Sequence, residues 1–210
     1  MAEKPILFNT EMVRAILEGR KTQTRRLVKG LPLGEPWFTV EDGKPMLCDE
    51  NGEWYPAERF STVQPGDILW VRETWAKDAG RYMYRANYSD TKKFYMNGRE
   101  IRMTWHPSIH MPRTAARLFL GVEDVRMERL QDMSVEDCVI DGGFNRDAAR
   151  LIDVARLFGP LWDGTIKKAD LPRYGWKANP WVWVYEFVRL DGRPAGLWAD
   201  MDAARYDGGY

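Results

Sequence analysis

The densest positive charge of this chain lies in its first thirty residues. Seven basic residues stand there against three acidic ones, which leaves a local net charge of +4 (7 minus 3). The basic residues are Lys4, Arg14, Arg20, Lys21, Arg25, Arg26 and Lys29, and the acidic ones are Glu3, Glu11 and Glu18. Such a patch can contact phosphate groups, but lysine and arginine also protect ordinary strand edges from pairing with other sheets. The charge alone leaves both interpretations open.

A second candidate is the segment Trp105–Arg113, which reads WHPSIHMPR, with Arg117 beyond it. It places an indole, two imidazoles and guanidinium groups in one loop, and aromatic rings beside cations suit stacking on a nucleobase. A packing loop stiffened by its prolines is the other interpretation. His106 and His110 are four residues apart, but Pro107 between them argues against a helical zinc face. We therefore expect no metal site.

The familiar enzyme signatures are missing, since the chain has no P-loop, GxGxxG, GxSxG or HExxH motif. We expect no cofactor. The 31 Lys and Arg residues balance the 31 Asp and Glu residues, so no overall field draws the protein to DNA or to an anionic membrane. A neutral chain favours a small ligand over a long duplex, because several phosphate contacts usually need an extended basic face.

The chain also carries few signs of export. Its N-terminus has no apolar run of signal-peptide length, and no apolar stretch approaches the roughly 20 residues of a membrane span. We therefore expect a cytoplasmic protein with no membrane partner. Cys48 and Cys138 are too few and too isolated for a disulfide framework, so both are expected to be free thiols.

The strands that must position these residues follow from the apolar pattern. Residues 5–8, 68–73 and 181–188 are apolar on both faces for most of their length, which is typical of buried strands. The strand at 68–73 ends in Arg72 and Glu73, and this end should face a solvent-exposed site. Residues 20–28 read as a loop running into a strand. We expect a long strand over 111–127 with a bulge at Gly121.

Helices are indicated by capping signals. Asn9 or Thr10 should cap a helix that stops at Gly19. Ser134-Val135-Glu136-Asp137 resembles a capping box, and Gly142-Gly143 should end the helix that it starts. A further helix is expected over 148–158.

Together these elements predict an α+β domain, a β-barrel of five to seven strands with two or three flanking helices. It should cover residues 1–190, with surface insertions near 30–64 and 76–104. Residues 191–210 should form a polar tail.

Three segments, in this order, resemble the ASCH domain family of the PUA-like superfamily. They are Gly19–Arg26 (GRKTQTRR), Pro65–Asp67 with Val71–Thr74 (PGD and VRET), and Ser134–Gly142 (SVEDCVIDG). The resemblance is spread over roughly residues 5 to 190. It is strongest to ASCH proteins of bacteriophages and prophages, which carry segments similar to WHPSIHMPR.

The resemblance implies a PUA-like barrel that binds RNA or a modified base. Small bacterial members of the family include amidohydrolases that remove the acetyl group from N4-acetylcytidine. Their catalytic set corresponds to Lys21, Thr24 and Asp141 of this sequence. The acidic position is usually Glu, so Asp141 shortens the side chain by one methylene, a shift of about 1 Å that matters for catalysis.

Elementary chemistry is compatible with that set. Arg20, Arg25 and Arg26 would lower the pKa of Lys21 by repulsion, and a threonine hydroxyl needs a base to become a nucleophile. Lys21 and Thr24 would face opposite sides of a regular strand. A shared site therefore requires residues 20–22 to form a turn.

Two further functions stay open. One is a reader that binds a base without reacting with it, with the basic segment on phosphate and Trp75 or Trp105 stacked on the base. The other is a phage accessory or assembly protein without base binding. For enzyme or reader the partner is a nucleoside or a single strand, RNA rather than DNA, and the sequence sets no oligomeric state. The candidate binding residues are Arg20, Arg25, Arg26, Glu73, Trp75, Trp105, His110 and Arg113.

Overall fold

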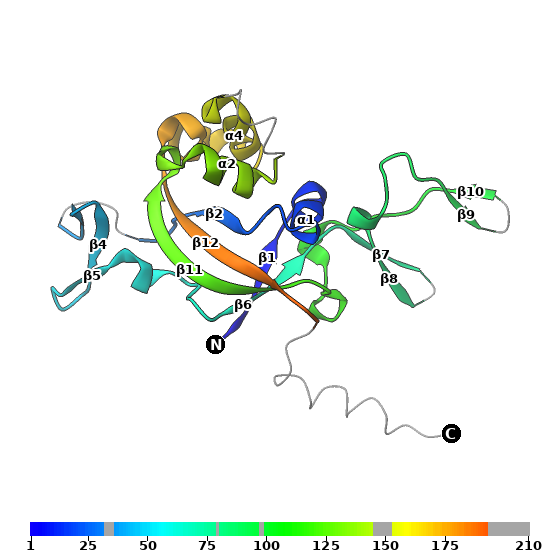
Figure 1. The fold of residues 1–210 in the computed structure, drawn as a ribbon, viewed down its shortest axis with the longest axis horizontal. Coiled ribbons are helices and arrows are strands. Elements are labelled where there is room, and N and C mark those ends of the chain that lie inside the picture. The colour runs from blue at the N-terminus through cyan, green and yellow to red at the C-terminus, as the bar shows by residue number, and fades with distance from the viewer. Residues whose placement is uncertain (32–35, 79, 97–98, 145–152, 193–210) are drawn as a thin grey trace, which may run out of the picture.

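The computed structural model describes residues 1–31, 36–78, 80–96, 99–144 and 153–192. Its centre is one five-stranded sheet in the order β1-β6-β11-β12-β2 (Figure 1). The strands are β1 (Glu3–Leu7), β6 (Ile68–Arg72), β11 (Phe119–Arg129), β12 (Trp181–Leu190) and β2 (Gln23–Leu27). β1 and β6 run parallel, and the other neighbours are antiparallel. Together with the helices, this sheet makes an α+β fold.

β12 shows why an apolar pattern on both faces marks a central strand. Val182 and Val184 pack into the core beneath the helices, whereas Trp183, Tyr185 and Phe187 pack into the larger core on the other side of the sheet. Successive side chains of a strand alternate between faces, so both faces can be apolar only where both are covered. The expected buried strand at 181–188 is confirmed.

Four α-helices lie within the described ranges: α1 (Thr10–Leu17), α2 (Val135–Gly142), α4 (Val154–Asp163) and α5 (Leu171–Tyr174). α2 and α4 cover one face of the sheet (Figure 1). Asn9 caps α1 through a hydrogen bond from Met12 N, and Ser134 with Asp137 forms the expected capping box. None of the described helices has the length and hydropathy of a membrane span.

Three small sheets flank the central one, at opposite ends of the molecule (Figure 1). Strands β3 (Phe38–Glu41), β4 (Lys44–Cys48) and β5 (Trp54–Pro56) make the first. Hairpins β7–β8 (Trp75–Asp78 and Arg81–Tyr84) and β9–β10 (Phe94–Met96 and Arg99–Ile101) make the others. These sheets fall almost wholly within the ranges predicted as insertions. They raise the strand count among the described residues to twelve, above the expected five to seven.

Two expectations about the long strand need correction, and two others fall partly or mostly on residues outside the described ranges. The long strand begins at Phe119 rather than Met111, because Pro112 and the tight turn Arg113–Ala115 occupy the preceding residues. Its register shift falls between Val122 and Asp124, whereas Gly121 pairs regularly on both sides. The first part of the helix expected over 148–158, residues 148–152, lies outside the described residues. The same holds for most of the polar tail, residues 193–210.

Strand pairing among the described residues gives an open sheet with β1 and β2 as its edges. Arg26 reaches across from β2 and donates a hydrogen bond to the carbonyl of Leu7 at the end of β1 (2.8 Å). The closed barrel stays a prediction.

The junction of α1 and α2 generates a prediction about two glycines. Gly19 (φ 73°) and Gly143 (φ 64°) both adopt the left-handed conformation, but a Cβ at Gly143 would lie 2.5 Å from Ala15 Cβ, whereas open space surrounds Gly19. We expect Gly19→Ala to lower the free energy of unfolding by about 1–2 kcal/mol through strain alone. Gly143→Ala should lose a further ~1–3 kcal/mol through the clash. Denaturant titration measures both, and equal losses would contradict the close packing of α2 on α1.

Candidate functional site

A cleft of about 750 Å³ opens between the start of α1, strand β2, the loop at 107–108 and helix α4. Its apolar lining includes Phe8, which belongs to the larger core, and Phe158 and Trp162 of α4. Its polar lining includes Thr24 and Asp141. The full lining is Leu7, Phe8, Asn9, Met12, Thr24, Arg25, Arg26, Leu27, Lys29, Thr74, Pro107, Ser108, Asp141, Phe158, Leu161, Trp162, Thr165 and Ile166.

The turn that a shared site requires is present. The backbone N–H groups of Arg20 and Lys21 both donate to the carbonyl of Ala15 (2.8 and 3.2 Å), so the chain turns directly after α1 and enters β2 only at Gln23. Because Lys21 precedes the strand, the alternation of strand faces does not separate it from Thr24.

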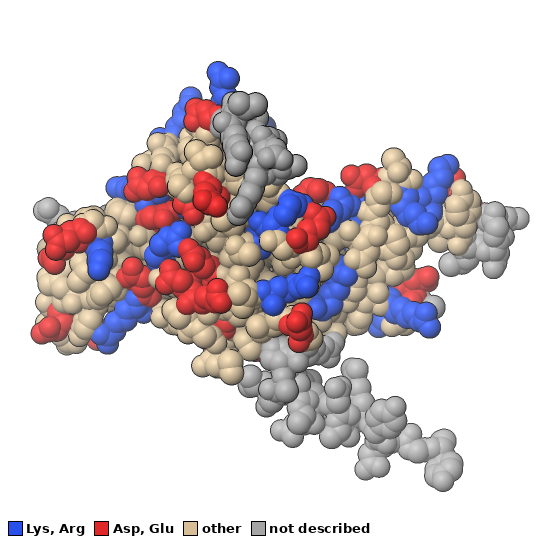
Figure 2. All heavy atoms as spheres, viewed as in Figure 1, with Lys and Arg blue, Asp and Glu red and all other residues tan. Residues whose placement is uncertain are grey.

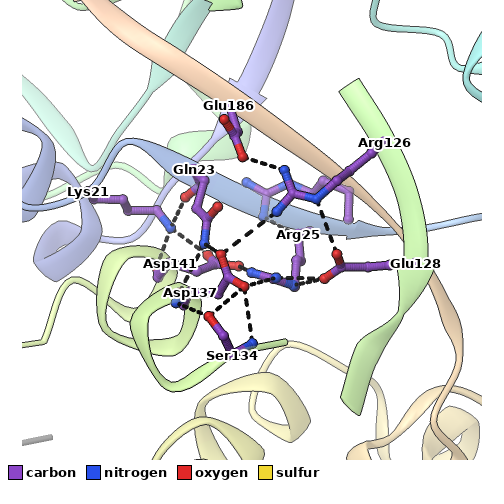
Figure 3. Close-up of polar contacts among 10 residues, drawn as sticks. Lys21, Gln23, Arg25, Arg126, Glu128, Ser134, Asp137, Asp141 and Glu186 are labelled. Carbon is purple, nitrogen blue, oxygen red and sulfur yellow. Dashed lines mark hydrogen bonds and ion pairs between the residues drawn. The ribbon is translucent and has the colours of Figure 1, made fainter. Parts of the chain in front are cut away.

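Lys21 and Asp141 form a fully buried ion pair (Figure 3). Lys21 Nζ lies 2.6 Å from Asp141 Oδ1, and the exposed fractions of the two side chains are 0% and 3%. The same ammonium group donates to the carbonyls of Gln23 (2.8 Å) and Asp141. All three of its protons therefore have acceptors, and Asp141, unlike Lys21, also lines the cleft.

A second cation shares the carboxylate of Asp141. Arg25 Nη1 lies 3.3 Å from Asp141 Oδ2, and Arg25 Nη2 lies 2.6 Å from Glu128 Oε1 on β11 and 3.6 Å from Asp137 Oδ2 on α2 (Figure 3). Burial lowers the pKa of Lys21, which Asp141 opposes, and Arg26 and Arg25 lower it further by repulsion. The predicted repulsion is thus present for Arg25 and Arg26 but not for Arg20, and burial is the larger cause.

The basic segment is positioned differently from what its charge suggested. The side chain of Arg25 is fully buried in ion pairs, so it is not turned outward toward a phosphate as predicted, although the residue lines the cleft. Arg20 donates to the carbonyl of Gly143, the left-handed residue that ends α2. Arg26 lines the cleft, with its guanidinium 5.1 Å from the centre of the Phe8 ring.

Glu73 and Trp75 do not line the cleft, although Thr74 between them does. Glu73 is buried and receives two hydrogen bonds from Arg117 (2.8 and 2.9 Å), so it holds the fold together instead of facing a ligand. Trp75 stacks against His106, with ring centres 4.9 Å apart. Its indole N–H is buried without a hydrogen-bond partner among the described residues.

The other candidates also lie away from the cleft. Trp105 packs against Phe94 and Tyr88 and lines a separate hollow. His110 is exposed in a short 3-10 turn. Arg113 forms an ion pair with Glu3 of β1 (2.5 Å). Trp105, His110 and Arg113 are close in sequence, which suggested one binding loop. The short 3-10 turns between them direct their side chains to different surfaces.

The sequence did not indicate the apolar lining of the cleft. It also did not indicate two of the carboxylates that pair with Arg25. Phe158 and Trp162 were indistinguishable from core residues of an amphipathic helix, since helical spacing does not say what covers a face. Glu128 and Asp137 come from elements more than 100 residues after Arg25. Asp137 had one local signal, the capping box, but this signal concerned only the helix terminus.

Comparison with known proteins does not name the family. No protein-family model matches the chain, and neither does any curated protein. A solved structure described as the crystal structure of hypothetical protein PH0355 is similar to it at 12% identity and a TM-score of 0.38, over 90% of this chain and 100% of that one. A similarity this weak carries no argument about fold or function.

The buried lysine generates a prediction about pH. Because the pKa of Lys21 is lower in the folded state than its ordinary value of 10.5, the unfolded chain binds more protons between these two values. Stability from this group therefore rises with pH in that window. We expect the free energy of unfolding of the wild type, relative to Lys21→Met, to increase as the pH rises toward 10.5, by at most about 1.4 kcal/mol per pH unit.

Urea titrations at pH 7 to 10 measure this difference. Lys93→Met, which removes an exposed ammonium in the β9–β10 region, controls for the general effect of alkaline pH. If the difference in unfolding free energy between wild type and Lys21→Met instead fell as the pH rose, the contact with Asp141 would affect the pKa of Lys21 more than burial does.

Proposed function

We propose that the protein binds a nucleoside, or an unpaired base of single-stranded RNA, in this cleft and hydrolyses an acyl amide on the exocyclic amine of the base, as N4-acetylcytidine amidohydrolases do. The observation that carries the proposal is the buried Lys21–Asp141 pair, whose carboxylate lines the same cleft as Thr24. On this proposal the five-stranded sheet corresponds to a PUA-like barrel of the ASCH type.

The dimensions and lining of the cleft suit such a ligand. A volume of about 750 Å³ lies within the range of roughly 300–1,000 Å³ that is typical of small-molecule sites. Leu161 and Ile166 line the cleft and are partly exposed, so they can contact the face of a base. Asn9 uses its side-chain oxygen to cap α1, so its amide N–H₂ group, which has no hydrogen bond with a described residue, is free to donate to a base edge.

The lining also suggests how the work is divided. Amide hydrolysis adds water across the C–N bond: an oxygen attacks the acyl carbon, and the departing amine gains a proton. Asp141 faces the cleft and can accept the proton of the attacking oxygen. Lys21 lies behind it and holds the carboxylate in place. Thr24 makes no side-chain hydrogen bond with the described residues, so its hydroxyl can position the attacking water, or can attack the acyl carbon itself, in which case water then hydrolyses the acyl ester of Thr24.

One observation favours a second candidate, a reader that binds a base without hydrolysis. All three protons of the Lys21 ammonium are already donated to acceptors within the protein. A cation satisfied in this way is typical of a structural role. The shorter Asp141, where the family usually has Glu, points in the same direction.

Substitution at Asp141 separates the two functions. If the protein is the proposed enzyme, Asp141→Asn should keep ligand binding but reduce turnover of an N4-acylated cytidine by about 100-fold or more, because an amide cannot accept a proton. If it is a reader, the same change should alter only affinity, by roughly 1–3 kcal/mol. Product formation followed by chromatography, together with calorimetric binding, measures both effects.

Two further variants complete this experiment. Glu128→Gln also removes a carboxylate from Arg25 but does not line the cleft, so it should largely retain turnover. Asp141→Glu restores the residue usual in the family and should keep or increase activity. If neither the wild type nor Asp141→Glu acts on any acylated nucleoside, the amidohydrolase function is wrong and only base binding stays to be tested.

A further inference from the structure

A second hollow, of about 600 Å³, lies on the arm, which we define as residues 85–105 with hairpin β9–β10. The arm projects from the body of the molecule (Figure 1). The hollow is lined by Arg85, Asp90, Lys92, Lys93, Phe94, Glu100, Ile101, Arg102, Met103 and Trp105. None of these residues lines the cleft that holds Asp141.

Positive charge dominates this hollow, with four cations against two carboxylates. Two of the cations are paired within the arm: Arg85 with Asp90 (2.6 Å) and Lys93 with Glu100 (2.8 Å). Lys92 and Arg102 are exposed and have no ion pair with any described residue. Basic side chains are visible on the arm in Figure 2. The hollow therefore carries a net charge of +2 (4 minus 2) on unpaired cations.

An aromatic surface lies beside these cations. Trp105 is only partly buried, and its ring packs against Tyr88 and Phe94 at centre distances of 5.9 and 6.0 Å. The guanidinium of Arg85 lies 5.7 Å from the centre of the same indole. A fixed aromatic ring next to unpaired cations is the combination that binds a base and its phosphate in single strands.

A short piece of chain connects the lining of the hollow with that of the cleft. Trp105 lines the hollow, whereas Pro107, two residues later, lines the cleft. Two residues span at most about 7 Å. Arg14 of α1, the helix that begins at the cleft, donates to the carbonyls of Ala86 (3.2 Å) and Tyr88 (2.6 Å) and so fixes the base of the arm.

We propose that the arm binds single-stranded RNA next to the base that enters the cleft, with phosphates on Lys92 and Arg102 and a neighbouring base on Trp105. This inference rests on the proposed function and narrows its substrate class to a polynucleotide, since a free nucleoside would leave the hollow empty. An acidic peptide would satisfy the cations but would not use the indole face.

The test compares an acylated cytidine with a short oligoribonucleotide (~10 nucleotides, within single-strand site sizes) that contains it. We expect Lys92→Glu with Arg102→Glu to weaken oligonucleotide binding at least about tenfold. In a plot of the log of the association constant against the log of the salt concentration, the magnitude of the slope should fall by about 1.4. Two phosphate contacts are lost, and each contributes about 0.7 for a single strand. Binding of the free nucleoside should not change. Lys44→Glu with Lys167→Glu, two exposed lysines outside the arm, gives the same change of net charge and should have little effect.

Trp105→Leu tests the stacking contact separately and should also weaken oligonucleotide binding about tenfold. Equal effects of the arm and control charge reversals, or none, would overturn the arm as a binding site. The same conclusion follows if the wild type binds the oligonucleotide no better than the nucleoside. If it binds neither of them, the base-binding function itself fails along with the arm site.

Discussion

The buried contact between Lys21 and Asp141 constrains much of the remaining structure. Both side chains are buried, with exposed fractions of 0% and 3%, and leaving one buried charge without its partner typically costs 3–5 kcal/mol. The turn after α1 and the last turn of α2 must therefore stay together. Gly143 allows the close approach to Ala15 that this requires, and Arg20 closes the same junction through the Gly143 carbonyl.

Arg25 extends this constraint from the helices to the sheet. Its guanidinium on β2 contacts Asp141 and Asp137 of α2 and Glu128 of β11. A planar group with several donors can hold three carboxylates at once, which a lysine could not do with the same geometry. Ion pairs thus hold the polar lining of the cleft to two strands and a helix. Rigid support of this kind is what a site with fixed geometry needs.

The same network shows how part of the positive charge of a neutral protein is used on folding. Two residues of the basic segment near the N-terminus, Lys21 and Arg25, are used inside the fold, where both contact the buried carboxylate of Asp141. Exposed cations without an ion pair among the described residues include Lys92 and Arg102 on the arm and Lys29, which lines the cleft. The sequence shows where positive charge is dense, but only the folded structure shows which cations are left without a carboxylate.

Local signals in the sequence determined the element boundaries that depend on a few neighbouring residues. The Asn9 cap, the Ser134–Asp137 capping box and the two apolar faces of β12 are of this kind. Tertiary structure alone decided which charges are buried: Arg25 meets Glu128 across 103 positions and Glu73 meets Arg117 across 44. It also directed Trp105 into the arm and placed α4 over the cleft. Propensity and capping act within about one turn of chain, whereas burial depends on which distant segments pack together.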